Sequence, residues 1–400
     1  MGRVVVLVEL KWIGHYETQL KLFVGIILKW GWKVIVLCPE PQVMECWVNE
    51  NLSEYKEKFY VSHLAEDKNK HFMKSINLWR KLQDCIHTAE RTTGWQVDIV
   101  FLVWLDGLMP GSLWQSPVIR GYFMTYPWVG IYFFPKAYRS DIYMRWSQRV
   151  RHRERSKVIL KSLNCQGIGV LDEDSYRGLL KELDKKNIFL LPDVTDEQLS
   201  DGAADQVRAI RQRAGNRPII GLIGVLDPRK GVLNFLRSIA AIDSSQCFFL
   251  LAGSLSEERY PPKDREELRR LLMLGNNENC YFKLGYISDA AMVNSLVNSC
   301  DILYLAYEKF YYSSGLLTKA AVFKKLVIVS KKYSMAKRVE EHKLGVAAAE
   351  GSLLETVEAI KYLLDEDNRN RLLAQAEFDR YHHFHCLPML EQTLYKMLTL

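Results

Sequence analysis

Apolar runs and a helical stretch alternate at the start of the chain. Val4 to Leu10 is an almost wholly apolar run, which predicts a buried parallel strand. Apolar residues then recur at helical spacing from Glu17 to Trp30, and Lys33 to Cys38 predicts a second strand. Strand, helix and strand in this order predict a βαβ unit.

The same alternation continues to the C-terminal region. Short apolar runs predict further strands at 98–104, 167–171, 188–191, 219–225, 247–252, 281–284, 302–306 and 326–330. Helical spacing predicts helices at 231–241, 264–274, 289–298, 314–324 and 353–365. The pattern predicts an α/β fold of doubly wound parallel sheets.

A polar stretch at 193–217 contains few large apolar residues, so we place a domain linker at its start. We therefore predict an N-terminal, acceptor-binding domain over 1–195 and a C-terminal, nucleotide-sugar-binding domain over 196–375. We expect the tail at 376–400 to pack back toward the N-terminal domain. A length of 400 residues allows each domain a full core.

Composition narrows the class of protein. With 48% hydrophobic and 25% charged residues, the chain is typical of soluble globular proteins. The net charge of +7 favours a polyanionic ligand or an anionic membrane surface, and is too small to indicate nucleic acid. The N-terminus turns polar too early for a signal peptide, and no apolar run is long enough to span a membrane.

The eight cysteines are scattered and form no CxxC pair, which predicts reduced thiols. We expect a cytoplasmic protein, with peripheral association with the inner face of a membrane as an alternative.

The first chemical motif is Gly224 to Gly231 (GVLDPRKG), which follows a predicted strand and opens a helix. Ligands of such sheets bind beyond the carboxyl ends of the strands. Arg229 and Lys230, with a helix N-terminus behind them, would bind a pyrophosphate. A surface turn with two solvated basic residues is the alternative.

The second motif follows the predicted strand at 302–306. Glu308 lies at the strand's carboxyl end, where it could accept hydrogen bonds from sugar hydroxyls. Ser313, Ser314 and Gly315 lie where the next helix begins, and form both a natural N-cap and an anion site. The alternative is a simple helix cap with an exposed carboxylate.

The third motif is the loop Gly285 to Asp289, after another predicted strand. In a nucleotide site its backbone could pair with a base edge, and Tyr286 and Ile287 could sandwich the base.

In this order, the three motifs resemble family 4 of the retaining glycosyltransferases, which have the GT-B fold of two Rossmann-like domains facing each other across a cleft. The likeness is best over residues 217–365. It implies that Gly224, Lys230 and Gly231 form the donor diphosphate turn, that loop 285–288 holds the base, and that Glu308 begins the donor-sugar motif. The turn Gly14-His15 resembles the family's N-terminal loop at the cleft, so His15 could contact donor or acceptor; a structural role is the alternative.

Two positions depart from the family pattern. Family members have a second glutamate eight positions after the first, where this chain has Leu316; alignment from the following strand places Lys319 there instead. That glutamate contacts the donor ribose in the family. The arginine expected after Gly224 is Val225, and Arg229 could supply its charge. These departures indicate a divergent branch or lost activity.

The resemblance implies a hexosyltransferase that uses no cofactor and no metal. Its donor would be a UDP or GDP sugar, whose diphosphate would be neutralised by Arg229, Lys230 and the helix N-terminus at 313–315. The acceptor would be a hydroxyl of a carbohydrate, a lipid-linked molecule or a small molecule, with retention of configuration. A catalytically silent nucleotide-sugar-binding partner and a GT-B-type epimerase remain alternatives.

Other features of the chain have weaker functional readings. Asp106 follows a predicted strand and could act on donor sugar or acceptor, although a turn-capping role is favoured. Aromatic residues crowd 121–139, and 145–161 contains seven basic residues against one acid, which suits an anionic membrane surface or, alternatively, a core strand followed by a solvated helix. The cluster 381–386 (YHHFHC) lacks the spacing of a structural zinc site.

Overall fold

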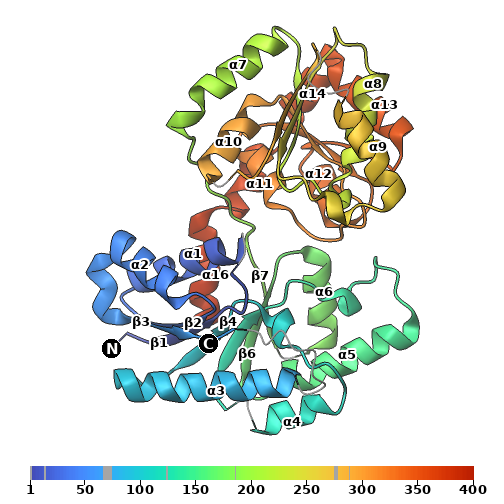
Figure 1. Cartoon of the computed structure of the whole chain (residues 1–400). Helices are drawn as coiled ribbons and strands as arrows, with labels where there is room; N and C mark the ends of the chain where they lie inside the picture. Colours follow the sequence, from blue (N-terminus) through green and yellow to red (C-terminus); the bar gives the residue numbers. More distant parts are fainter. Residues whose placement is uncertain are drawn as a thin grey trace. The chain divides into compact units, whose positions relative to one another are not determined.

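A computed structural model describes residues 2–12, 15–65, 74–122, 125–184, 186–273, 278–287 and 289–400. The chain divides into two compact units (Figure 1). One unit comprises Met1–Leu191 with Glu391–Leu400, and the other comprises Pro192–Leu390. The first segment of the N-terminal unit thus ends at Leu191, just before the predicted boundary at 195. Of the predicted tail at 376–400, only Glu391–Leu400 belongs to the N-terminal unit.

The N-terminal unit is built on a seven-stranded parallel sheet with the order β3-β2-β1-β4-β5-β6-β7. The strands are β1 Val4–Val8, β2 Lys33–Cys38, β3 Phe59–His63, β4 Ile99–Leu102, β5 Trp128–Ile131, β6 Cys165–Val170 and β7 Asn187–Leu190. β1 pairs with β2 on one side and with β4 on the other, so the order reverses at β1 and β4. Such a switch point opens a crevice at the carboxyl ends of the strands.

Helices cover both faces of this sheet because both faces are apolar. Val4, Val6 and Val8 share a buried cluster with Trp79 of α3, while Phe101 on the alternate face contacts Phe23 of α1 at 5.3 Å between ring centroids. The helices are α1 His15–Lys29, α2 Pro41–Asn51, α3 Lys74–Thr93, α4 Gln115–Tyr122, α5 Trp146–Leu160, α6 Glu173–Glu182 and α16 Leu387–Leu398.

The C-terminal unit contains a six-stranded parallel sheet with the order β10-β9-β8-β11-β12-β13. The strands are β8 Ile219–Ile223, β9 Phe248–Gly253, β10 Cys280–Leu284, β11 Ile302–Leu305, β12 Leu326–Ser330 and β13 Gly345–Ala348. The helices are α7 Ala204–Ala214, α8 Val232–Ala241, α9 Pro262–Met273, α10 Ala290–Ser299, α11 Gly315–Val322, α12 Tyr333–Glu341, α13 Leu353–Leu364, α14 Glu366–Gln375 and α15 Phe378–Phe384. The order reverses between β8 and β11, which places the loops after these two strands at a second switch point.

Two polar or aromatic stretches contain elements that the sequence did not define. The stretch 193–217, at whose start we placed the linker, contains α7, which buries little more than Ile210 and Ala214. The aromatic stretch 121–139 follows the core-strand alternative: β5 lies within it, and Trp128, Phe133 and Tyr138 are buried. No helix in the described ranges is both long and apolar enough to cross a bilayer.

Candidate functional site

The loop after β8 takes its shape from two glycines. Gly224 has φ 112° and Gly231 has φ 68°, both in the left-handed region that favours glycine. Gly231 also has no room for a side chain, because a Cβ atom there would lie 2.6 Å from the Ala306 carbonyl oxygen. Between them, the short helix η5 (Pro228–Lys230) directs its basic residues along the carboxyl edge of the sheet.

Lys230 is a buried cation with a single neutral partner in the described part of the chain. Its side chain is 7% exposed, and its Nζ donates a hydrogen bond of 2.5 Å to the Tyr307 hydroxyl. The same Nζ lies 3.6 Å from where a Cβ atom on Gly224 would be. An ammonium group has three N–H donors, so two remain for a ligand or water. A buried, incompletely paired cation favours an anionic ligand.

Arg229 and Glu308 tie the two loops of the switch point together. The backbone N–H of Glu308 donates to the Arg229 carbonyl oxygen at 2.7 Å. The Arg229 guanidinium lies 4.9 Å from the Phe310 ring centroid, and its Nε is 3.7 Å from Asp227 Oδ2. This side chain remains 40% exposed, so it combines a fixed position with access to a ligand.

Glu308 lies in the loop that directly follows β11, at the carboxyl edge of the sheet. Partial burial raises the pKa of Glu308, and the charge of Glu350 raises it further, while Lys309 and Arg237 act in the opposite direction. A half-buried carboxylate held by its own backbone is suited to accept hydrogen bonds from a polyhydroxyl ligand.

The start of α11 is open at its first residue. Ser314 is the N-cap but makes no side-chain capping bond, and its Oγ lies 3.5 Å from the Tyr307 hydroxyl. A Cβ atom on Gly315 would meet nothing within 4 Å. The free backbone N–H groups of the first turn can therefore be reached by an anion.

Ser313 is already engaged by the protein. Its hydroxyl donates to Asp193 Oδ2 at 2.6 Å and accepts a bond of 2.6 Å from Arg338 Nη1. The sequence placed Ser313 with Ser314 and Gly315 as a donor contact. Its side chain instead bonds Asp193 and Arg338 and so fixes the position of the loop.

The structure separates the two positions at which the resemblance leads us to look for a second glutamate. Leu316 Cδ1 lies 3.8 Å from the Cβ position of Gly224, so Leu316 lies beside the turn Gly224–Gly231. Lys319 is directed elsewhere, because its Nζ bonds Asn294 Oδ1 and the Asp196 carbonyl oxygen. Burial lowers the pKa of Lys319 to about 8.

The loop after β10 places its two predicted base contacts differently. Gly285 has φ 145° and its N–H bonds the Gly253 carbonyl oxygen at 2.9 Å. Tyr286 is 77% exposed, whereas Ile287 packs against the core of the C-terminal unit. Tyr286 is thus the freer of the two side chains to stack on a base.

In the N-terminal unit, Asp106 serves as a turn cap. Its two carboxylate oxygens accept bonds of 2.8 Å from the backbone N–H groups of Phe133 and Phe134, just after β5. Burial raises the pKa of Asp106 to about 6 in spite of these bonds. His15 is the first residue of α1, and its side chain lies outside the described atoms, as does Gly14 altogether.

Sequence reasoning missed Glu9, the single acid directly after the apolar run of β1. Glu9 is fully buried; its Oε1 accepts the N–H groups of Leu10 and Lys11 at 2.8 and 3.0 Å, and its Oε2 has no partner in the part of the chain that the structure describes. Burial raises the pKa of Glu9 to about 7. The neighbouring Lys11 ammonium lies 5.0 Å from the Trp104 ring centroid. The sequence did contain a signal that could have identified Glu9, because it is an acidic residue within an otherwise apolar run.

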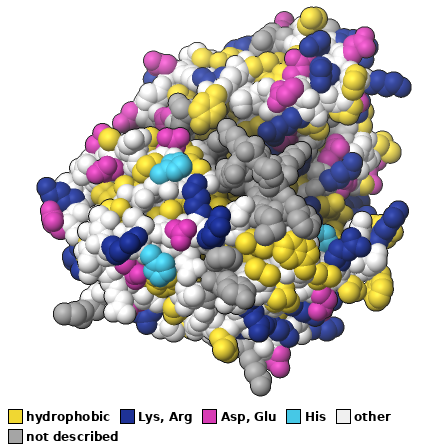
Figure 2. Space-filling model, turned by 60° about the horizontal axis from the view of Figure 1, so that its bottom comes forward, with side chains coloured by type: hydrophobic (Ala, Val, Ile, Leu, Met, Phe, Trp, Pro, Cys, Tyr) yellow, Lys and Arg dark blue, Asp and Glu magenta, His cyan; other side chains and the backbone are white. Residues whose placement is uncertain are grey.

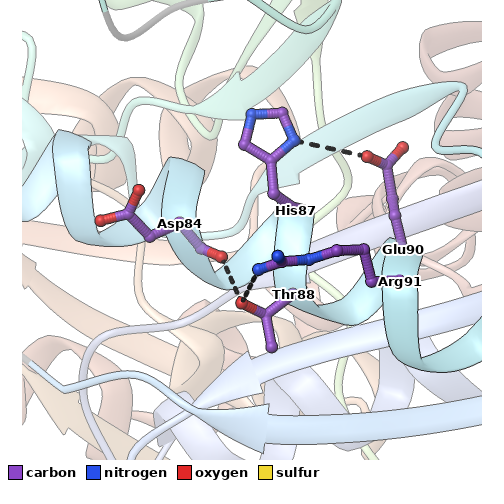
Figure 3. A pocket seen from close by; sticks show the side chains of 5 residues that line it. All are labelled: Asp84, His87, Thr88, Glu90 and Arg91. Atoms are coloured by element: carbon purple, nitrogen blue, oxygen red, sulfur yellow. Dashed lines mark hydrogen bonds and ion pairs between the residues drawn. The ribbon is translucent and has the colours of Figure 1, made fainter.

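A shallow hollow on α3 contains none of the predicted site residues. It is lined by Asp84, His87, Thr88, Glu90 and Arg91, which pair largely with one another (Figure 3). The Tyr126 hydroxyl bonds both Glu90 Oε2 and His87 Nδ1, at 2.7 and 2.8 Å. Because most of these side chains bond one another or Tyr126, we assign no ligand to the hollow.

Two of the three histidines in 381–386 have separate side-chain partners. His385 is buried and accepts the Asp193 N–H at 2.9 Å, while His382 Nε2 lies 2.7 Å from Glu197 Oε1. Within the described ranges, no three His, Cys, Asp or Glu side chains are grouped to hold a metal ion.

Comparison with known proteins supports the fold and gives a family match over part of the chain. The family model of the glycosyl transferases group 1 matches residues 204–379, whereas no curated protein sequence matches the chain. Sucrose-phosphate synthase (tll1590) from Thermosynechococcus elongatus superposes with a TM-score of 0.69 at 14% identity, over 99% of this chain and 98% of that one. Anabaena HepE, solved with UDP and glucose, gives a TM-score of 0.67 at 13% identity over 99% of both chains.

The fold is also shared with an enzyme of another reaction class. UDP-GlcNAc 2-epimerase from Neisseria meningitidis, bound to UDP-GlcNAc, gives a TM-score of 0.59 at 15% identity, over 99% of this chain and all of that one. Residues 204–379 of the C-terminal unit are therefore similar to the glycosyl transferases group 1, in a chain that has the GT-B fold.

Proposed function

We propose that this chain is a hexosyltransferase, which moves a sugar from a UDP or GDP donor to an acceptor hydroxyl with retention and without a metal. The observation that carries the proposal is the arrangement around Lys230. A buried, incompletely paired ammonium, the Arg229 guanidinium and the open first turn of α11 all belong to the two loops of one switch point. Three positive groups there suit a diphosphate.

The proposed reaction breaks the bond between the anomeric carbon of the sugar and the diphosphate oxygen. Negative charge grows on the leaving nucleoside diphosphate, where Lys230, Arg229 and the N–H groups at Gly315 would stabilise it. The acceptor oxygen forms the new bond from the face that the diphosphate leaves. Its proton passes to a phosphate oxygen of the leaving group, so no protein base is required.

Glu308 would orient the donor sugar rather than hold the phosphates. Its backbone is fixed to Arg229, and its carboxylate follows directly after Tyr307, the partner of Lys230. A carboxylate at this position can accept bonds from sugar hydroxyls. HepE is solved with UDP and glucose, and the Neisseria epimerase with UDP-GlcNAc, which supports a nucleotide sugar as the donor class.

Two other functions fit parts of the site. Leu316 beside the diphosphate turn, in place of a second acidic residue, favours a catalytically silent nucleotide-sugar-binding partner. The fold shared with the Neisseria enzyme favours an epimerase.

Product analysis separates these functions. The purified chain is incubated with a panel of UDP and GDP sugars, with and without sugar, lipid-linked and small-molecule alcohols, and free nucleoside diphosphate and the sugar products are measured. Acceptor-dependent release of nucleoside diphosphate supports transfer. Conversion of the nucleotide sugar to its epimer without release indicates an epimerase, and binding without any turnover indicates the silent partner.

A further inference from the structure

Two aromatic side chains project from the N-terminal unit at the start of α5. Tyr143 is 93% exposed and Trp146 is 79% exposed. Aromatic residues of this size normally bury most of their surface, so two highly exposed ones within one short segment suggest a surface that is covered in use.

The segment that carries them is held firmly by a buried cation network. The Arg149 guanidinium donates to the carbonyl oxygens of Ala137, Arg139 and Ile142. Arg139 is itself fully buried and pairs with Asp141 and Asp172 at 2.6 and 2.7 Å. The exposure of Tyr143 and Trp146 is therefore imposed by a fixed backbone and does not follow from a loose loop.

The charge of this face is positive but smaller than the sequence suggested. Four of the seven basic residues in 145–161 have partners inside the unit: Arg149, Arg153, Arg155 and Lys157. Arg145 and Arg151 are exposed, and the described residues provide no ion-pair partner for either. Asp141 is occupied by Arg139, and Glu154 by Lys157.

The N-terminus of α5 adds to this positive field. Arg145 is its N-cap, no side chain caps the helix, and its first turn contains no acid. Because a helix N-terminus carries partial positive charge, an arginine there reinforces attraction for an anion instead of balancing the dipole.

A second exposed segment lies against the same helix. Arg155 of α5 donates to the Gly111 carbonyl oxygen at 3.0 Å, and Ser116 of α4 donates to the Arg155 carbonyl oxygen at 3.0 Å. Between these anchors, Leu113 and Trp114 are 49% and 43% exposed. In the view that turns this end of the molecule forward, hydrophobic side chains gather on the surface with Lys and Arg side chains around them (Figure 2).

We propose that Tyr143, Arg145, Trp146 and Arg151 form a docking face for an anionic lipid bilayer. Tryptophan and tyrosine favour the headgroup region, where the ring is in an apolar layer and the polar atom in water. Arginine binds lipid phosphates through planar paired donors. Docking here needs no insertion of a helix, and it does not depend on the donor site in the C-terminal unit.

Vesicle co-sedimentation of the full chain tests the docking face. The probes are phosphatidylcholine vesicles with and without phosphatidylglycerol. We expect binding to the anionic vesicles only, and a steep loss as salt rises from about 0.1 to about 1 M, because screening shortens from about 10 to about 3 Å. Each basic residue at the surface contributes about fivefold in affinity, so Arg145→Gln/Arg151→Gln should weaken binding roughly 25-fold.

Matched controls lie at the other end of the same helix. Lys161 and Leu163 are exposed, the latter to 94%, and α5 places them about 20 Å from Trp146. Lys161→Gln and Leu163→Ser should leave vesicle binding unchanged, whereas Tyr143→Ser/Trp146→Ser should weaken it. The proposal is overturned if the wild type ignores anionic vesicles at low salt, or if Lys161→Gln weakens binding as much as the arginine pair does per charge. Self-association that Tyr143→Ser/Trp146→Ser abolishes, without vesicle binding, would show a protein interface instead.

Discussion

Tyr307 explains how Lys230 can be buried in the turn Gly224–Gly231. Its hydroxyl accepts one bond from Lys230, and its ring centroid lies 4.2 Å from the same ammonium. Neither contact neutralises the positive charge of Lys230. Tyr307 therefore fixes the position of the ammonium group but leaves its charge unbalanced. The sequence predicted the basic residues from their place before a helix. It could not predict Tyr307 as their partner, since that contact joins loops far apart in the chain.

We expect Glu308→Gln to reduce turnover more than nucleotide affinity. The carboxylate would bond the sugar, while other groups would hold the diphosphate. Loss of a charged hydrogen bond corresponds to a fall of about 10- to 100-fold in rate, with less than about threefold change in affinity for the bare nucleoside diphosphate. Steady-state kinetics and calorimetry measure the two quantities. Equal losses in both would place Glu308 on the phosphates instead.

Glu9 makes the stability of the N-terminal unit depend on pH. Its pKa is raised by burial from 4.5 to about 7, so the folded state binds the proton more tightly than the unfolded state. The stabilisation is complete below about pH 4.5 and is lost as pH rises through about 7, by roughly 3 kcal/mol at most. We expect Glu9→Gln to flatten the fall in thermal midpoint between pH 5 and pH 8. An unchanged slope, matching that of exposed Glu54→Gln, would contradict this.

Among the secondary-structure elements, the buried central strands were the most predictable. β1, β2, β8, β9, β11 and β12 are apolar on both faces and appear as continuous apolar runs. The edge strands β3 and β13 were missed because β3 is only half-buried and β13 consists of small residues. β5 was hidden in an aromatic stretch. α7 was missed because its apolar stripe is too narrow to distinguish from a linker.

The turn between η5 and α8 requires a glycine for two reasons, which are its left-handed backbone and its close approach to Ala306. A second glycine that has only the positive φ allows the two effects to be separated. Gly231→Ala would combine a left-handed backbone with a clash against the Ala306 carbonyl oxygen, for a cost of about 2–4 kcal/mol. Gly351 has φ 72° but open space around it, so Gly351→Ala should cost only about 1 kcal/mol. Thermal unfolding compares the two. Equal destabilisation would mean that the close approach at Gly231 does not constrain the fold.

At the scale of the whole chain, sequence and structure agree on two α/β units, and the three predicted motifs lie on the loops after β8, β10 and β11. The motifs were predictable because strand, loop and helix are contiguous in the chain. The roles within them were not, since Ser313 and Lys319 are engaged by Asp193, Arg338 and Asn294 through tertiary contacts.

Transfer by this chain should proceed without a divalent metal. In the proposed reaction, Lys230, Arg229 and the first turn of α11 would supply the positive charge that a metal would otherwise bring to the leaving diphosphate. Activity should therefore be unchanged after dialysis against EDTA. Loss of activity in EDTA, with recovery on addition of magnesium or manganese, would contradict the proposed chemistry.

The most direct test of the account is calorimetric titration of UDP and GDP into the wild type and into Lys230→Ala and Arg229→Ala. Each substitution removes charge-assisted bonds to the diphosphate, so we predict a loss of about 1.5–3 kcal/mol, or roughly 10- to 150-fold in Kd. The control is Lys309→Ala. Lys309 is an exposed lysine next to Glu308, and its backbone N–H, rather than its ammonium group, donates a hydrogen bond to Glu350 Oε1. Weakened binding in both test variants but not in the control is the predicted result. Wild-type affinity in both test variants would contradict the claim that this turn holds the donor.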